Sequence, residues 1–179
     1  MKRVTFLSLI AIMFLSACSQ QLNYFTEDIY EKNKWSESEL KQIQFYVSED
    51  IELERVRSAS ESSITDGQIQ INKGRKVEKI VIRKGTPGTL VFSPSTNRFA
   101  VSFDDDPSNY LMFGPNPKAR GKYVLLAKDW KKHTGIVSYG NSEYQTTSES
   151  AFAALMVDIR QAKKMSYTKT TASGRTIKG

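Results

Sequence analysis

The sequence is poor in the residues on which most enzyme sites depend. Its 179 residues include one cysteine, Cys18, and one histidine, His133. A lone cysteine cannot close a disulfide within the chain, and these two residues cannot supply the three or four nitrogen and sulfur ligands of a usual zinc site. A serine nucleophile would depend on His133 as its base. This histidine lies in a charged segment between two apolar runs, which indicates an exposed loop residue.

The glycine patterns of nucleotide-binding loops and of the nucleophile elbow of hydrolases are also missing. The one dense acidic cluster, at residues 104–106, lacks the alternating oxygen ligands and the distant glutamate of a calcium loop. We interpret this cluster as a solvated loop. The sequence therefore predicts a protein that is not an enzyme and has no catalytic residues, no metal site and no cofactor.

Charge is distributed unevenly along the chain, whose formal net charge is +7. Residues 160–179 contain six basic residues and no acidic one. With Lys2 and Arg3 also set aside, 18 of the 26 basic residues remain in the rest of the chain, against all 19 acidic residues. A basic segment of this kind binds nucleic acid, anionic lipid headgroups or an acidic protein surface, or it is simply solvated. The sequence leaves lipid binding and solvation open.

The first 18 residues have the layout of a secretory signal peptide. A positive start, Met1-Lys2-Arg3, precedes an apolar run from Val4 to Leu15. These twelve residues span about 18 Å as a helix, which is short of the roughly 30 Å hydrocarbon core of a bilayer. The segment therefore predicts export of the chain and is a poor permanent membrane span.

Residues 15–18, Leu-Ser-Ala-Cys, resemble the lipobox of bacterial lipoproteins. The resemblance implies that residues 1–17 are removed and that Cys18 receives a diacylglyceryl thioether and, usually, an N-acyl chain. Two or more chains anchor a protein stably, whereas one does not. The alternative is that Cys18 is a buried thiol beside an ordinary cleaved signal.

Localisation follows from this resemblance. Ser19 follows the cysteine, and by resemblance to enterobacterial sorting this residue favours the outer membrane over the inner membrane. We expect a protein of the cell envelope that is attached to the membrane through Cys18. Export makes nucleic acid an unsuitable partner for the basic segment.

Two segments have helical patterns. Ser36 and Glu39 form a capping-box pair, while Trp35 and Leu40 are spaced as a hydrophobic staple, which predicts a helix over about 36–48. Near the other end, Phe152, Leu155, Met156 and Ile159 fall on one helical face among several alanines. This second pattern predicts a helix over about 149–164.

Between the two helical patterns, short apolar runs alternate with polar residues and turn residues. The predicted strands include 51–53, 69–71, 77–82, 90–92, 99–103, 110–113, 123–127, 136–139 and 143–146. If six to eight of these nine runs form strands, their close spacing favours a small antiparallel barrel or sandwich. The fold class is therefore mainly β with flanking helices (α+β).

The segments Ile80–Val91 and Arg98–Phe103 together are similar to the SH3-like barrels of bacteria. In those barrels a strand enters a glycine-rich diverging turn, and a hairpin follows that ends in an apolar strand. The resemblance extends from Lys79 to Phe103, about 25 residues, and implies an SH3-like barrel. Envelope domains of that family often bind peptidoglycan or other proteins.

We divide the chain into four parts. Residues 1–17 are the predicted signal peptide, and residues 18–33 a lipidated tether with a short helical turn against the domain. Residues 34–165 form a single β-rich domain with its helices, and residues 166–179 a basic, disordered tail.

Aromatic residues gather in the second half of the chain. Tyr110, Trp130, Tyr139 and Tyr144 are the candidates for an exposed binding surface, since aromatic grooves recognise peptides and glycans. The alternative is that such side chains fill the interior of a small barrel.

These observations together predict a non-catalytic, lipid-anchored envelope protein. It would act as a structural or protein-binding component, in an envelope or secretion assembly, with the membrane and an envelope protein as its partners. The alternative function is a peptidoglycan-binding lipoprotein that links membrane to wall.

Overall fold

The computed structural model describes residues 21–57, 63–65, 68–70, 76–131 and 134–165. In these ranges the chain is mainly β, with two antiparallel sheets and a few short helices, as the sequence predicted. A separate two-stranded ladder joins β4 (Ser63–Thr65) to β5 (Gln68–Gln70).

The larger sheet has seven strands, in the spatial order β1 (Asn23–Tyr24), β14 (Leu155–Val157), β2 (Gln44–Val47), β7 (Pro87–Ser95), β8 (Arg98–Ser102), β9 (Tyr110–Asn116) and β10 (Lys122–Leu125). Its two ends meet, because isolated bridges pair Lys122 with Thr26 and Val124 with Ala154. Strand β10 therefore lies beside both the segment after β1 and the segment before β14. The sheet closes on itself around its apolar side chains.

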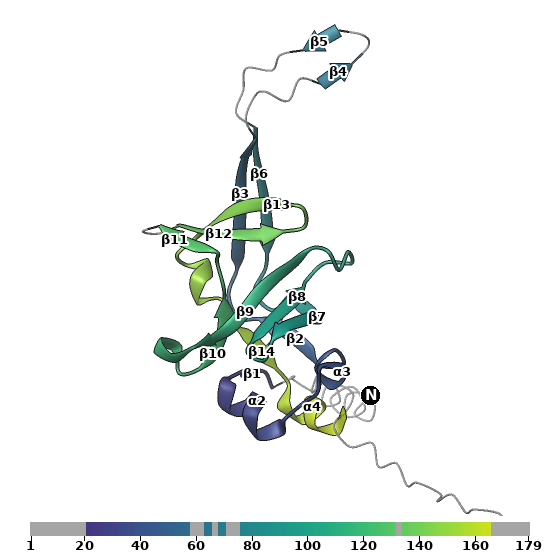
Figure 1. Cartoon of the computed structure of the whole chain (residues 1–179), viewed down its shortest axis with the longest axis vertical. Coiled ribbons are helices and arrows are strands. Elements are labelled where there is room, and N and C mark those ends of the chain that lie inside the picture. Colours follow the sequence, from purple (N-terminus) through teal and green to yellow (C-terminus); the bar gives the residue numbers. More distant parts are fainter. Residues whose placement is uncertain (1–20, 58–62, 66–67, 71–75, 132–133, 166–179) are drawn as a thin grey trace, which may run out of the picture.

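The smaller sheet has five strands, in the order β11 (Asp129–Lys131), β12 (Thr134–Tyr139), β13 (Ser142–Thr147), β3 (Ile51–Arg57) and β6 (Lys76–Ile82). Strand β13 pairs with β3 only at Leu53 and Glu54. The outer half of the β3–β6 ladder therefore extends past β13, and Figure 1 shows it pointing away from the helices at the other end of the molecule.

One hydrophobic core contains side chains from both sheets, and aromatic rings stack at its centre within the larger sheet. Phe25 is completely buried, and its ring centroid lies 4.9 Å from that of Tyr123, 5.3 Å from Phe45 and 5.6 Å from Phe99. The contacts with Tyr123 and Phe45 are edge-to-face, and such contacts stabilise a core beyond the area that they bury. The backbone hydrogen bond from Tyr123 N to Phe25 O, at 3.1 Å, links this ring cluster to the closure of the sheet.

The helices are short. They are α2 (Glu27–Asn33), α3 (Glu37–Leu40), α4 (Ile159–Met165) and the 3₁₀ turns η2 (Pro117–Ala119) and η3 (Ser150–Phe152). None of the helices in the described ranges is long and apolar enough to cross a membrane.

The predicted helix over 36–48 is correct only in its first turn. The capping box is present, since Ser36 N donates to Glu39 Oε2 at 2.8 Å and Glu39 N donates to Ser36 Oγ at 3.3 Å. The helix ends at Leu40, however, and residues 44–47 form β2, which pairs with β14 on one side and β7 on the other. Ile43, Phe45 and Val47 are buried at alternate positions, a period of two that the helical interpretation overlooked.

The predicted helix over 149–164 is wrong in its middle. After η3, residues 155–157 form β14, a strand inside the larger sheet, and α4 begins only after Asp158. The carboxylate of Asp158 accepts hydrogen bonds from Arg160 N and Gln161 N, at 3.0 and 3.3 Å. Phe152, expected on a buried helical face, is 74% exposed. Pairing on both sides of β14 outweighs the helix propensity of the neighbouring alanines.

The folded part begins before the predicted boundary at residue 34. The short helical turn expected within 18–33 is present as α2, whose N-cap is Thr26. Because Phe25 belongs to the core and β1 belongs to the larger sheet, residues 23–33 are part of the fold. The free part of any tether therefore lies before Asn23.

The segment compared above with SH3-like barrels spans β6, β7 and β8. Strand β6 leads into a turn at Gly85, whose φ of 80° favours glycine, and the β7–β8 hairpin follows. Strands β6 and β7 belong to different sheets, so the chain passes from the smaller sheet to the larger one at this turn.

The position of Phe25 generates a stability prediction. We expect Phe25→Ala to lower the free energy of unfolding by about 3–5 kcal/mol, because it removes a fully buried ring from the centre of the core. The neighbouring change Tyr24→Ala is the control and should cost less than about 1 kcal/mol, because Tyr24 is 40% exposed. Urea unfolding measures both values. Equal losses from the two changes would contradict the core assignment.

Candidate binding surfaces

Two residues singled out from the sequence lie outside the described ranges. These are Cys18, the predicted lipidation site, and His133. The four aromatic candidates are all described, and they do not form one surface.

Trp130 and Tyr110 pack against neighbouring strands. Trp130, on β11, is 39% exposed and lies opposite Gly135 on β12. A Cβ atom on Gly135 would lie 2.8 Å from Trp130 Cζ3, so one face of the indole rests on the glycine. Tyr110, half-buried at the start of β9, makes an edge contact with Phe92 at 5.1 Å between ring centroids. Each ring is thus partly used in packing.

Tyr139 and Tyr144 are brought together, with ring centroids 6.2 Å apart, and both are buried. Their hydroxyl groups point to carboxylates: Tyr139 OH donates to Asp104 Oδ2 and Tyr144 OH to Glu78 Oε1, each at 3.3 Å. The two side chains therefore contribute polar tips to a surface, and their ring faces belong to the core.

These hydroxyl groups border a polar pocket of about 400 Å³. Its lining consists of Arg55, Glu78, Ile80, Asp104, Asn109, Tyr139, Gly140, Asn141, Ser142 and Tyr144. Neither Tyr110 nor Trp130 is part of it. The pocket therefore joins β3, β6 and the β12–β13 turn to the loop before β9.

Arg55 organises the inner side of this polar pocket. Its guanidinium pairs with Glu78 at 2.9 Å, donates to Ser142 Oγ, and lies 5.4 Å from the ring centroid of Tyr144. Arg55 Nε is buried and has no hydrogen-bond partner in the described part of the chain. The lining thus contains one cation, which is already paired with Glu78, and a second carboxylate, Asp104.

Burial and the nearby carboxylate change the acidity of Tyr139. Removal from water and the adjacent charge of Asp104 together raise the pKa of Tyr139 from 10.0 to about 12, since both disfavour the phenolate. The phenol is therefore a hydrogen-bond donor at neutral pH.

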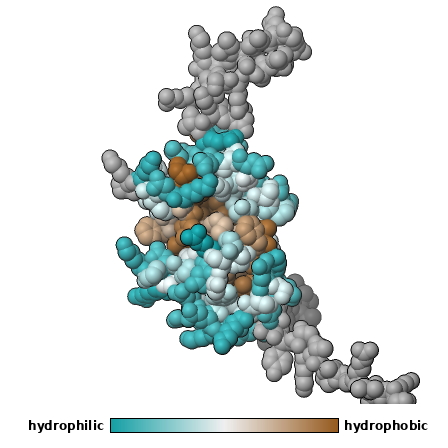
Figure 2. All heavy atoms as spheres, in the orientation of Figure 1, coloured by the Kyte–Doolittle hydropathy of each residue, from teal (hydrophilic) through white to brown (hydrophobic). Residues whose placement is uncertain are grey.

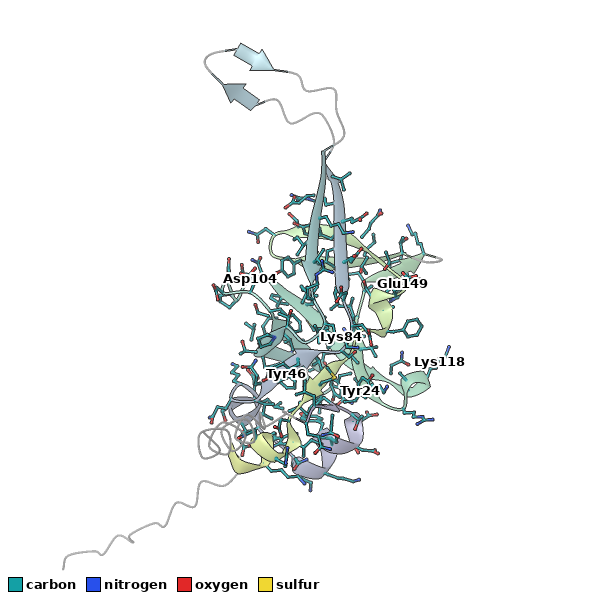
Figure 3. The ribbon with its side chains drawn as sticks, turned by 180° about the vertical axis from the view of Figure 1, so that it is seen from behind. Tyr24, Tyr46, Lys84, Asp104, Lys118 and Glu149 are labelled. Atoms are coloured by element: carbon teal, nitrogen blue, oxygen red, sulfur yellow. The ribbon has the colours of Figure 1, made fainter. Side chains whose placement is uncertain are left out.

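The acidic loop at residues 104–106 has a local structural role. The carboxylate of Asp104 accepts from Asp106 N, and that of Asp106 accepts from Ser108 N, both at 2.9 Å. The latter bond lowers the pKa of Asp106. Figure 3 shows Asp104 in this loop at the side of the molecule. Within the described ranges, no three His, Cys, Asp or Glu side chains are placed to hold one metal ion.

A second hollow, of about 200 Å³, is an apolar cleft where the two sheets meet. It is lined by Arg98, Met112, Leu126, Ala127, Lys128, Val137 and Ser138. Figure 2 shows apolar surface between the two sheets, on the face that carries β9 and β12 in Figure 1.

The segment from Leu126 to Lys128 creates this apolar cleft, because it crosses from one sheet to the other. Leu126 N donates to Met112 O on β9, and Lys128 N donates to Ile136 O on β12, both at 2.8 Å. A Cβ atom on Gly114 would lie 2.8 Å from Leu126 Cδ1, so the leucine packs over β9 only because glycine is there.

Charge lies at the rim of the apolar cleft. Lys128 pairs with Glu143 at 2.7 Å, and both side chains are more than half exposed. Arg98 is exposed and has no ion pair among the residues that the structure describes. The cleft thus combines an apolar floor with one unpaired cation. Sequence reasoning missed it, because Met112, Leu126 and Val137 each read as ordinary strand residues.

Comparison of the chain with family models, with curated proteins and with solved structures finds no significant match.

The environment of Tyr139 predicts a pH dependence. Above pH 10 the unfolded chain loses the phenolic proton of this residue while the folded chain keeps it up to about pH 12. Tyr139 should therefore lower the free energy of unfolding as the pH rises between these values. We expect Tyr139→Phe to show a shallower decline than the wild type in urea titrations at high pH. Identical slopes for the two proteins would contradict this assignment.

Proposed function

We propose that the protein is a lipid-anchored, non-catalytic component of the cell envelope that binds a protein partner through the apolar cleft. The observation that carries the binding part of this proposal is the cleft itself, with its apolar floor and the unpaired Arg98 at its rim. Anchoring rests on the Leu-Ser-Ala-Cys sequence at residues 15–18.

The chemistry of the cleft defines the partner. Met112, Leu126 and Ala127 are half-buried, so an apolar side chain from another protein would remove their remaining surface from water. A carboxylate beside that side chain would pair with Arg98. The partner is therefore a protein segment that presents an apolar side chain next to an acidic one. Anchoring would assist the binding of a partner that is attached to the same membrane, because it would confine both proteins to one surface.

The anchor is tested by metabolic labelling with a fatty-acid analogue. We expect the wild type to become labelled and Cys18→Ser to remain unlabelled, since the serine lacks the thiol that forms the thioether. In-gel detection of the analogue measures the label. Equal labelling of both proteins would overturn the anchoring proposal.

The cleft is tested by co-purification in mild detergent. We expect the double variant Arg98→Glu, Met112→Glu to recover at least about tenfold less partner than the wild type, because it places two negative charges where an acidic, apolar segment would bind. The control is Arg83→Glu, Val81→Glu, which changes one exposed arginine and one half-buried valine on another surface. Quantitative mass spectrometry measures recovery, and thermal unfolding confirms that both variants fold. An equal yield from both variants would exclude the cleft.

The alternative function, binding of peptidoglycan, is favoured by a different observation. The polar pocket offers the amide groups of Asn109 and Asn141 and the hydroxyl group of Ser142, which suit a polyhydroxylated ligand. Sedimentation with purified sacculi distinguishes the two functions. Co-sedimentation that Asn141→Asp weakens and the cleft variant leaves unchanged supports wall binding, and absence of co-sedimentation excludes it.

A further inference from the structure

The register of β1 on β14 places the two ends of the described fold side by side. Asn23 pairs with Val157 in an antiparallel ladder. In such a ladder the start of one strand lies beside the end of the other. The chain that leads back to Cys18 and the chain that continues through α4 to residue 165 therefore leave the sheet at the same place, and Figure 1 shows β1, β14 and α4 at the same end as α2.

The distance from the proposed anchor to this place is short. Four residues separate Cys18 from Asn23. Even a fully extended chain would span at most about 18 Å between these two positions. A lipid on Cys18 would therefore hold the β1 end of the fold within about two Debye lengths of the bilayer surface at physiological ionic strength.

Cations flank β1 on the side of β10. The ammonium group of Lys122 lies 3.5 Å from the ring centroid of Tyr24, which is 40% exposed. Lys118 and Arg120, on the turn that precedes β10, are exposed and have no ion pair in the described part of the chain. Figure 3 shows Tyr24 and Lys118 on the same side of the molecule. An exposed aromatic ring next to basic groups suits a lipid–water interface.

Cations also follow β14 on the other flank. In α4, Lys163 is exposed, and Arg160 lies 4.0 Å from Asp158, a contact at the limit of an ion pair. The sequence from residue 159 to residue 179 contains no acidic residue. The sequence that follows α4 therefore adds positive charge and no negative charge.

Acidic groups at this end are fewer and partly engaged. Glu27 accepts a hydrogen bond from Asn97 Nδ2 at 3.1 Å, and Asp158 caps α4. Asp28 and Glu31 are exposed on α2, where Lys32 and Lys34 follow them. These four acidic residues are outnumbered by the seven basic residues named at this end, Lys32, Lys34, Lys118, Arg120, Lys122, Arg160 and Lys163.

Most cations elsewhere on the described fold pair with carboxylates, although Arg98 at the apolar cleft does not. Such pairs include Lys79 with Glu52 at 2.8 Å, Arg83 with Asp50 at 2.8 Å, Lys84 with Glu49 at 3.5 Å and Lys131 with Asp129 at 3.8 Å. Unpaired positive charge is thus concentrated where the chain enters and leaves, and it is available for an external anion.

We propose that this end of the fold, defined by Tyr24, Lys118, Arg120, Lys122 and Lys163 and here called the basic end, binds the phosphate headgroups of anionic phospholipids. The proposal deepens the proposed function, because the anchor would bring the basic end to the bilayer. Headgroup binding itself needs no lipid on Cys18, so headgroup binding and anchoring can be tested separately.

The test uses the chain from Ser19 onward, which lacks the lipidation site and retains all the described residues. Flotation with vesicles of phosphatidylcholine mixed with phosphatidylglycerol is compared with flotation with phosphatidylcholine alone. We expect binding to the anionic vesicles only. The triple variant Lys118→Glu, Arg120→Glu, Lys163→Glu should bind at least about tenfold more weakly at low ionic strength, since each charge near an anionic surface contributes to adsorption.

The matched control is Arg83→Glu, Lys84→Glu, Lys131→Glu, which makes the same change in net charge on other elements. We expect it to retain most of the binding. Equal losses from the two triple variants, or no binding of the wild type, would overturn the proposal. Release by inorganic phosphate but not by chloride at equal ionic strength would also overturn it, because that result indicates a site for free phosphate. If the chain binds anionic vesicles but Cys18 is not labelled by the fatty-acid analogue, the anchoring proposal is refuted and the proposal for the basic end is retained.

Discussion

The fold depends on the segment that begins at β1 and inserts Phe25 into the larger sheet. The backbone of Phe25 donates to Leu155 O at 2.8 Å and accepts from Tyr123 N at 3.1 Å, so one residue bridges β14 and β10. Its ring meanwhile fills the centre of the aromatic cluster. The same residue thus closes the sheet and completes its core. Because closure leaves few unpaired strand edges, it also limits the edge-to-edge association to which open sheets are prone.

Both helix predictions were wrong over part of their length, and for the same reason. Residues 44–47 and 155–157 are neighbouring strands, with Val47 opposite Leu155, although they lie far apart in the sequence. Each segment is short and apolar, and its spacing fits both a helix face and a strand. Local signals, such as the capping box at Ser36, were identified correctly because they involve only nearby residues. The structure of the remaining residues depends on pairing between strands that are distant in the sequence. The spacing of apolar residues does not reveal such pairing.

The candidate binding surfaces also combine features that nearby residues determine with features that depend on residues distant in the sequence. The sequence singled out Tyr139 and Tyr144 as exposed aromatics, and the fold buries their rings and exposes only the groups around their hydroxyls. The apolar cleft arises where residues 126–128 cross between sheets, a position that no local pattern marks. By contrast, the run of basic residues after residue 159 is visible in the sequence. The sequence could not show that this run begins just after the strand that pairs with β1, which follows from the pairing of Asn23 with Val157.

The register of β1 bears on orientation if Cys18 carries the proposed lipid. A long flexible tether would let the domain turn freely, whereas Asn23 is fixed in the larger sheet and only four residues separate it from Cys18. With the basic end on a bilayer, the β3–β6 hairpin would point away from the membrane, since it lies at the opposite end of the fold in Figure 1. The apolar cleft, between the two sheets, would then face sideways. A partner attached to the same membrane would reach the cleft laterally, and a wall-bound partner would meet the hairpin first.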